Sequence, residues 1–214
     1  MYYTKSMAIT NKVKIAALCA LAAIFSIVTF GVLTGKTSDF DLEWSKTIYS
    51  LRTPVLTQTM FAVSSISSTP ATGLLTAIVI AAFWLKNRRK TAVFFGAALL
   101  AGVIANNAIK YSIHRFRPDI APLEDASFYS FPSGHSMNSL VFYGTLLYIA
   151  HRLIKNKYLL AAMDIAAIIF VSLVGFSRIY LGAHFPTDVV AGFVAGACVL
   201  CAAIEIGNRR SDSI

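Results

Sequence analysis

The sequence predicts an all-α integral membrane protein with six transmembrane helices, and three observations favour this fold class. Hydrophobic residues make up 57% of the 214 residues, and the mean hydropathy of +0.66 is far above that of an ordinary soluble domain. Charged residues make up only 14% of the chain, and they cluster between long apolar runs. These runs have about the 20 residues that a helix needs to cross a hydrocarbon core. Because a helix satisfies its own backbone hydrogen bonds in lipid, each run is predicted to be helical.

The first span is predicted over 13–33, and it is expected to stay in the mature chain because a cleaved secretory signal has a shorter apolar core. Residues 35–53 are polar and form a surface loop with room for a short interfacial helix, in which Trp44 suits the headgroup layer. The apolar stretch that follows is too long for one span. Because SSISSTP at 64–70 disfavours a helix, we expect an interfacial segment and then a second span over about 69–85.

The last four spans are each bounded by a basic or polar turn. They are predicted over 91–109, 133–150, 158–176 and 188–206. The sequence contains no internal repeat and no low-complexity tract. The whole chain, 1–214, is therefore expected to form a single membrane-embedded domain.

Basic residues predict how the bundle is oriented in the cell membrane. By the positive-inside rule, the side that carries most lysines and arginines in its loops faces the cytoplasm. Both termini are on that side, so both are expected to be cytoplasmic. Orientation also explains the net charge of +9, since no continuous basic face indicates nucleic-acid binding. The residues counted on this side are the clusters at 86–90 and 151–157 with Lys5, Lys12, Lys14, Arg209 and Arg210.

The three cysteines, Cys19, Cys198 and Cys201, all lie in apolar runs, where a thiol packs as a small hydrophobic group. Cys198 and Cys201 form a C-x-x-C pair, but no second pair of ligands accompanies it, so a redox or metal site is the weaker interpretation. No group of residues has the spacing of metal ligands. We therefore expect no metal and no cofactor, and the sequence indicates no oligomeric state.

Polar residues that a helix end does not require occur in three segments, all on the side opposite the basic clusters. The segments are KYSIHRFRP at 110–118, PSGH at 132–135 and SRIYLGAHFPTD at 177–188. Each lies at the end of one of the last four predicted spans, so the topology brings the three together. Polar groups are costly in a membrane protein, and one shared site explains them better than three separate structural roles.

The three segments resemble the signatures of the type 2 phosphatidic acid phosphatase family, K-x6-R-P, P-S-G-H and S-R-x5-H-x3-D. All three are present without a substitution and in the family order, and the resemblance covers about 91–206. It implies a membrane lipid phosphatase that needs no cofactor. It also implies an active site at the outer ends of the last four spans, on the extracytoplasmic side. A lipid phosphate or diphosphate and the bilayer itself are the expected partners.

The residue types in these segments fit phosphoryl transfer. A transferred phosphoryl group spreads negative charge over its oxygens, so positioned cations and N–H donors stabilise it. Lys110, Arg117 and Arg178 would provide the cations, although any one of them alone could be a side chain reaching for the membrane surface. Ser133 and Gly134 begin a helix, where a hydroxyl and free N–H groups can bind an anion, and Ser133 could equally be only an N-cap.

The two histidines of the signatures have separate expected roles. The family assigns His184 as the nucleophile, and Asp188, four residues later, is close enough to bond its ring and fix the tautomer. His135 is the expected proton donor to the leaving oxygen and then the base for water. His114, Arg115 and Asp119 lie beside the first signature but not at its fixed positions, so they either adjust substrate contact or solvate the loop. Asn106 and Asn107 are expected either to bond across helices or to support Lys110, and the packing role is favoured.

The resemblance leaves the substrate open among undecaprenyl diphosphate, phosphatidylglycerophosphate and phosphatidic acid, of which we favour undecaprenyl diphosphate slightly. An anionic lipid or solute transporter, in which the basic cluster captures an anion without hydrolysis, is the alternative from another functional class. A phosphotransferase that passes the phosphoryl group to an acceptor other than water is a further alternative.

Overall fold

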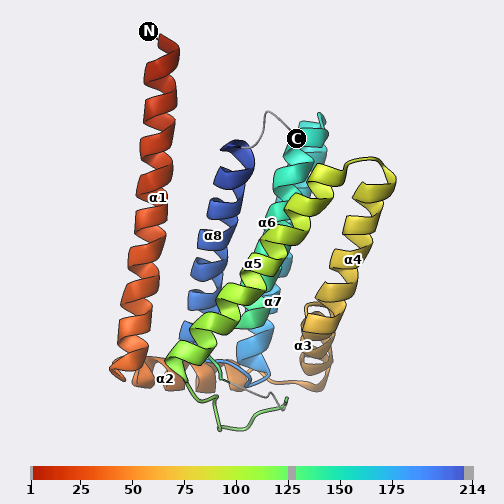
Figure 1. Ribbon diagram of the computed structural model, residues 1–214. Coiled ribbons are helices and arrows are strands. Elements are labelled where there is room, and N and C mark those ends of the chain that lie inside the picture. Colours follow the sequence, from red (N-terminus) through yellow and green to blue (C-terminus); the bar gives the residue numbers. More distant parts are fainter. Residues whose placement is uncertain (1, 125–128, 210–214) are drawn as a thin grey trace.

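The structure, a computed structural model, describes residues 2–124 and 129–209, with side chains for 15–124 and 129–208. All regular secondary structure in this part of the chain is α-helical, as the composition predicts. Figure 1 shows the helices, which are α1 (Tyr2–Leu33), α2 (Ser38–Tyr49), α3 (Pro54–Ile66), α4 (Thr69–Leu85), α5 (Arg89–Ile113), α6 (Gly134–Leu153), α7 (Lys157–Tyr180) and α8 (Pro186–Arg209).

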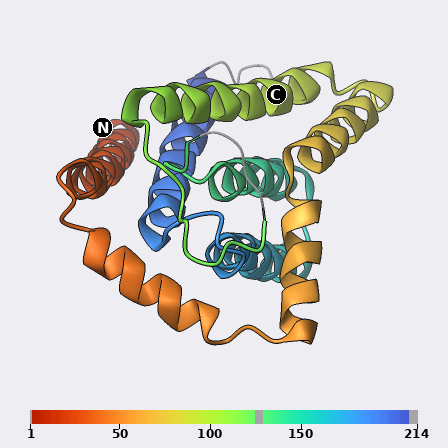
Figure 2. The same cartoon turned by 90° about the horizontal axis from the view of Figure 1, so that it is seen from below.

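The long helices run along one direction, and α2 crosses the lower end of the molecule (Figure 1). Seen from below, α2 and α3 form two sides of a frame with α6 and α7 inside it (Figure 2). The central helix is α6, which packs against α5, α7 and α8, while α1 packs on α8. Because α6 carries PSGH at its start, the most enclosed helix of the bundle also carries part of the predicted site.

Polar caps determine where the helices begin. The hydroxyls of Thr53 and Ser68 accept hydrogen bonds from backbone N–H groups in the first turns of α3 and α4, and each helix has a proline in its first turn. Asn156 caps α7 in the same way. The predicted interruption is present but shorter than 64–70, because α3 continues to Ile66 and α4 begins at Thr69. α4 has the predicted bounds of the second span.

Four helical segments are long and apolar enough to cross a membrane by length and composition. They lie in α1, α5, α7 and α8, and the pair α3 and α4, bent by 48° at its break, adds a fifth if it is one broken span. The predicted interfacial segment is thus a helix, α3. The total of six spans stays a prediction, because α6 is not among the helices that are long and apolar enough by this test. Its polar residues face neighbouring helices, which shield α6 from lipid.

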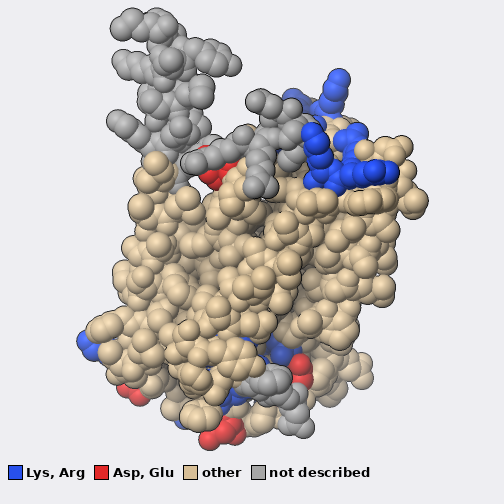
Figure 3. Space-filling model, viewed as in Figure 1, with Lys and Arg blue, Asp and Glu red and all other residues tan. Residues whose placement is uncertain are grey.

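The surface has the polarity expected of a bundle in lipid. Figure 3 shows a broad band without lysine, arginine, aspartate or glutamate, with charged side chains at the two ends. Large apolar side chains such as Ile27, Leu74, Ile104 and Ile168 are more than half exposed, whereas buried serines, asparagine and charged groups lie inside. This distribution supports a multi-pass membrane protein.

The two basic turns, 86–90 and 151–157, lie at the end of the bundle opposite α2 (Figure 1). The first residues of α1 and the last of α8 are at this same end, as the predicted topology requires. The other basic residues that support the orientation are outside the described part of the chain, namely the side chains of Lys5, Lys12, Lys14 and Arg209 and the whole of Arg210.

Candidate active site

The three polar segments meet around a cavity of about 580 Å³ at the α2 end of the bundle. We call it the polar cavity; it is bordered by the last turn of α5, the first turn of α6 and the connection from α7 to α8. Six of the eight predicted site residues line it: Lys110, Arg117, Gly134, His135, Arg178 and His184. The other two, Ser133 and Asp188, do not line it and are completely buried.

His184 lies in the turn between α7 and α8, and it is only 2% exposed. Its Nδ1 is 3.5 Å from Oδ2 of Asp188, and its Nε2 is 3.2 Å from Nη1 of Arg117. A guanidinium group only donates hydrogen bonds, so Nε2 accepts and the ring proton is assigned to Nδ1, facing the carboxylate. The unprotonated ring nitrogen of His184 is therefore Nε2, which lies beside the guanidinium group of Arg117.

Burial lowers the pKa of the His184 imidazole well below its ordinary value, and the positive charges of Arg117, Lys110 and Arg178 lower it further. The imidazole is therefore neutral when the cavity is empty. A neutral ring retains the lone pair that a nucleophile needs.

Two of the cations connect the loops that surround the polar cavity. Nζ of Lys110 donates to the backbone oxygens of Tyr129 at 2.6 Å and Ser130 at 3.4 Å. Nη1 of Arg117 donates to the backbone oxygen of Ala183 at 2.8 Å. These bonds hold the loop after α5 and the turn before His184 next to each other while the charges remain at the cavity wall.

The third cation, Arg178, is paired with a carboxylate that the sequence did not indicate. Nη1 and Nη2 of Arg178 donate to the two oxygens of Glu124 at 2.8 and 3.0 Å, and Nη1 also donates to the hydroxyl of Ser64 on α3. Glu124 lines the polar cavity as well. Two parallel N–H groups of this kind match a phosphate as well as they match a carboxylate. The Glu124 carboxylate thus occupies the donors that were predicted from the sequence to bind a substrate phosphate.

Ser133 has the N-cap role that was one of its two predicted possibilities. Its hydroxyl accepts from the backbone N–H of Ser136 at 3.4 Å and from the hydroxyl of Ser136 at 3.0 Å. Its own N–H donates to the backbone oxygen of Asp188 at 2.9 Å, which joins the starts of α6 and α8. Direct contact between this hydroxyl and a substrate stays a prediction, whereas Gly134 lies at the cavity wall.

Arg115 is a second residue whose importance the sequence did not reveal. Its Nη1 donates to Oδ1 of Asp188 at 2.6 Å, and its Nη2 donates to Oδ2 of Asp41 at 2.6 Å. Asp41 comes from α2, 74 residues away from Arg115 in sequence, and is 1% exposed. The interpretation of Arg115 as a residue that only solvates the loop is wrong, because its side chain contacts the buried carboxylate behind His184. A role in substrate contact stays a prediction. No local motif could have indicated a pairing between residues so far apart.

Asn106 joins α5 to the beginning of α6. Its Nδ2 donates to the backbone oxygen of Pro132 at 3.4 Å, and its side-chain oxygen would lie 3.1 Å from a Cβ placed on Gly134. Asn106 and Asn107 both line the polar cavity. The predicted packing role thus describes Asn106, which also helps to shape the cavity.

Two glycines allow the backbone segments of the site to approach one another. A Cβ at Gly192 of α8 would lie 2.6 Å from the backbone oxygen of Ser133, so α8 could not come this close to α6 with a larger residue. Gly182, in the turn before His184, has a φ of +78°, and a Cβ there would lie 2.9 Å from Cα of Pro122. The left-handed conformation and the close contact both favour glycine at this position.

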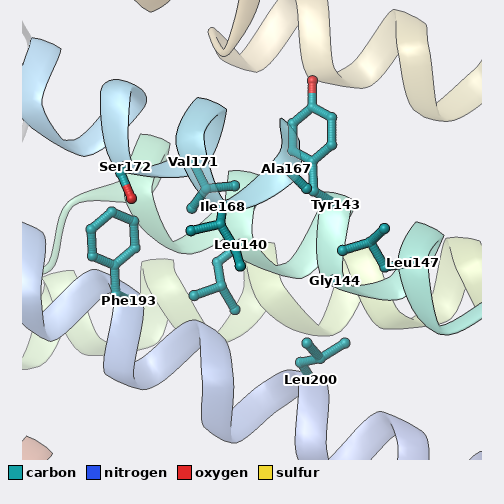
Figure 4. A pocket seen from close by; sticks show the side chains of 10 residues that line it. All are labelled: Leu140, Tyr143, Gly144, Leu147, Ala167, Ile168, Val171, Ser172, Phe193 and Leu200. Carbon is teal, nitrogen blue, oxygen red and sulfur yellow. The ribbon is translucent and has the colours of Figure 1, made fainter. Parts of the chain in front are cut away.

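Another cavity, of about 330 Å³, lies between α6, α7 and α8. Figure 4 shows that its walls are mainly aliphatic and aromatic side chains, among them Leu140, Val171, Phe193 and Leu200. The residues that line it carry no charge and include none of the predicted site residues. The chemistry predicted from the sequence therefore belongs to the polar cavity.

Comparison with known proteins identifies the family of this chain. Residues 91–212 match the PAP2 superfamily. Phosphatidylglycerophosphatase B of Bacillus subtilis is 36% identical over 181 residues, which cover 83% of this chain and 88% of that protein. An undecaprenyl-diphosphatase of the same species is 28% identical over 131 residues, covering 58% of this chain and 63% of that protein.

Among solved structures, the crystal structure of a transmembrane PAP2 type phosphatidylglycerolphosphate phosphatase from Bacillus subtilis superposes with a TM-score of 0.85. The superposition covers 92% of this chain and 98% of that chain, at 28% identity. The match of fold, the family match over more than half of the chain and the named phosphatases among its relatives agree. The chain is a membrane phosphatase that belongs to the PAP2 superfamily.

Proposed function

We propose that this phosphatase hydrolyses a lipid phosphate or diphosphate through a phosphohistidine formed at Nε2 of His184. The observation that carries the proposal is the position of the His184 ring, which lies between the carboxylate of Asp188 and the cations of the polar cavity. A carboxylate on one side keeps the proton on Nδ1 and stabilises the charge that develops, while the other nitrogen is available for attack.

In the first step, Nε2 of His184 attacks phosphorus and the bond between phosphorus and the leaving oxygen breaks. His135, on the wall of the same cavity, donates a proton to that oxygen, so that the lipid product leaves as an alcohol, or as a monophosphate if the substrate is a diphosphate. The ring of His184, now bonded to phosphorus, is positively charged. Asp188 compensates for this charge at Nδ1.

In the second step, water attacks the phosphohistidine, and His135 accepts a proton from this water. The bond between phosphorus and Nε2 breaks, inorganic phosphate leaves, and both histidines return to their starting states. Lys110, Arg117, Arg178 and the N–H groups at the start of α6 would stabilise the phosphoryl oxygens in both steps.

An apolar groove next to the polar cavity supports a substrate with a hydrocarbon chain. The groove has a volume of about 270 Å³ and lies between α4, α5 and α6. It shares Thr69, Val103, Gly134, His135 and Asn138 with the polar cavity, so the two are continuous. A phosphate bound near His135 would thus have an apolar path for its chain.

For the headgroup, we place phosphatidylglycerophosphate first and undecaprenyl diphosphate second, the reverse of the slight preference drawn from the sequence. The match to phosphatidylglycerophosphatase B covers 83% of this chain and 88% of that protein. The match to the undecaprenyl-diphosphatase covers only 58% of this chain and 63% of that protein. We further propose that six spans are present, with α3 and α4 forming one and α6 another. In this topology the termini are cytoplasmic and the polar cavity opens on the extracytoplasmic side.

The test is release of inorganic phosphate by the purified protein in detergent, with phosphatidylglycerophosphate, undecaprenyl diphosphate and phosphatidic acid at equal surface concentration. The His184→Ala variant is the control for contaminating phosphatases. We expect the highest kcat/KM with phosphatidylglycerophosphate. A higher value with undecaprenyl diphosphate would overturn the choice of headgroup, and full activity of His184→Ala would overturn the mechanism.

A further inference from the structure

Behind the polar cavity, two buried carboxylates share one arginine. Arg115, in the loop after α5, donates to Asp188 at 2.6 Å through one terminal nitrogen and to Asp41 at 2.6 Å through the other. Asp188 is completely buried, Asp41 is 1% exposed and the side chain of Arg115 is 14% exposed. Burying two carboxylates this deeply carries a desolvation cost that a cation between them offsets.

This arrangement defines the orientation of Asp188. Oδ1 of Asp188 accepts from Arg115, and Oδ2 accepts from the backbone N–H of Phe185 at 2.9 Å. Oδ2 is also the oxygen that faces Nδ1 of His184, at 3.5 Å. With one oxygen held by the guanidinium group and the other by the backbone, the carboxylate plane cannot rotate away from the imidazole.

The orientation of Arg115 is fixed in turn by α2 and α8. Oδ1 of Asp41 accepts from the backbone N–H of Thr187 at 3.0 Å, and Oδ2 accepts from the Thr187 hydroxyl at 2.7 Å. The guanidinium group also stacks on the ring of Phe185, 4.4 Å from its centroid. Neither Arg115 nor Asp41 lines the polar cavity. An influence of these two side chains on the reaction would therefore be indirect, and Asp188 is the predicted site residue that Arg115 contacts.

We propose that Arg115 and Asp41 are positioning residues for catalysis, because together they hold the Asp188 carboxylate against Nδ1 of His184. The inference rests on the proposed role of His184 as nucleophile and adds α2 to the elements that support it. It explains why a helix at the end of the bundle buries an aspartate next to the start of α8.

The two residues are expected to change the rate of chemistry and not the binding of substrate. A small displacement of a catalytic group can lower the rate by about a hundredfold, so we expect kcat to fall about tenfold to a hundredfold in Arg115→Lys and about tenfold in Asp41→Asn. Lysine keeps the charge but cannot bridge two carboxylates as a planar guanidinium does. The KM for substrate and the inhibition constant of inorganic phosphate should stay within about twofold, since neither residue lines the cavity.

The experiment is a double-mutant cycle with Arg115→Lys, Asp41→Asn and the two combined, measured as kcat, KM and phosphate inhibition in detergent. If both act through one connected carboxylate, the combined variant should be no slower than Arg115→Lys alone. The matched control is Asp39→Asn, which changes the same charge on an exposed position of α2 and should leave kcat unchanged. Asp41→Asn keeps an oxygen that can accept from Thr187, so it serves if Arg115→Lys does not fold.

Unchanged kcat in Asp41→Asn, or losses that multiply in the combined variant, would overturn the proposal. A rise in KM or weaker phosphate inhibition with unchanged kcat would overturn it as well, because the residues would then act on binding. Phosphoenzyme formation by His184→Ala is measured in the same experiment. It separates the assignment of His184 as nucleophile from the positioning proposal for Arg115 and Asp41. If that variant still forms phosphoenzyme, the nucleophile assignment fails; if it forms none while both positioning variants behave as wild type, only the positioning proposal fails.

Discussion

The two ring nitrogens of His184 lie in opposite electrostatic surroundings. Nδ1 faces the carboxylate of Asp188, and Nε2 faces the guanidinium group of Arg117. Burial and the neighbouring cations keep the empty site in the neutral form, and a bound phosphate dianion would offset that positive charge. In the proposed mechanism, His184 is thus ready to attack before substrate arrives and can bear a positive charge once phosphate is present.

A pH dependence of stability follows from the lowered pKa of His184. Below pH 6.5 the unfolded chain binds a proton at this residue and the folded protein does not, so stability is lost as the pH falls. The loss is at most about 1.4 kcal/mol per pH unit. We expect the apparent Tm of the ligand-free protein to fall more steeply between pH 7 and 5 than that of His184→Gln. Parallel curves for the two proteins would show that His184 titrates normally.

If Arg178 binds the substrate phosphate as proposed, Glu124 competes for the same N–H groups, so replacing Glu124 should strengthen anion binding. In Glu124→Gln the two N–H groups of Arg178 face a neutral amide and no longer a carboxylate. The pair is partly exposed, and we therefore expect the inhibition constants of phosphate and vanadate to fall by about twofold to fivefold. Asp119→Asn removes the same charge from an exposed position of the same loop and should have little effect. Weaker phosphate binding by Glu124→Gln would contradict this account.

The sequence predicts those site residues that belong to short motifs at helix ends, such as Lys110, His135 and His184. It does not predict their partners Glu124, Ser64 and Asp41, which are distant along the chain and belong to no motif. Arg115 illustrates the reason. Its spacing within the loop is uninformative, and only the packing of α2 against the start of α8 gives it two carboxylates.

At the scale of elements, the approach of α6 and α8 brings the two histidines to one cavity. The N–H of Ser133 donates to the backbone oxygen of Asp188, and Gly192 leaves room for the backbone of Ser133. The positions of His135 and His184 therefore depend on how closely these two helices pack.

Gly192→Ala should destabilise the protein and reduce its activity. The added Cβ would lie 2.6 Å from a backbone oxygen, so α6 and α8 must separate. Forced overpacking of this kind costs roughly 1–3 kcal/mol. Thermal unfolding in detergent measures the effect, with Gly73→Ala as the control, because a Cβ at that helical position meets no atom within 4 Å. An equal Tm for the two variants would mean that the contact between α6 and α8 is looser than the structure indicates.

Helices that face lipid could be predicted closely from the sequence, since apolar runs and basic turns mark their ends. The first predicted span, 13–33, ends where α1 ends, and the predicted second span coincides with α4. The sequence defined α2 and α3 less well, because both lie in segments of mixed polarity. The position of α2 depends on contacts such as Asp41 with Thr187, which only the tertiary structure provides.

For the whole molecule, the distribution of charge predicts which end faces the cytoplasm. The basic turns 86–90 and 151–157 lie at the end opposite the polar cavity. In a variant without Cys19, Cys198 and Cys201, we expect an impermeant thiol reagent to label Asp119→Cys on intact cells, and Lys86→Cys only after the cells are opened. Labelling of Lys86→Cys alone on intact cells would invert the topology and with it the side from which substrate is taken.

The central claim is that His184 forms the phosphoenzyme and that His135 assists proton transfer. The measurement that tests it most directly is rapid-quench analysis of acid-labile phosphohistidine with an activated aryl phosphate that the site accepts. His184→Ala should form no phosphoenzyme, because this variant lacks the ring nitrogen that we propose attacks phosphorus. His135→Ala should still form it, because a leaving group of low pKa needs little protonation, but should hydrolyse it slowly. Phosphoenzyme in His184→Ala, or a phosphate label mapped to His135, would contradict the assignment of both residues.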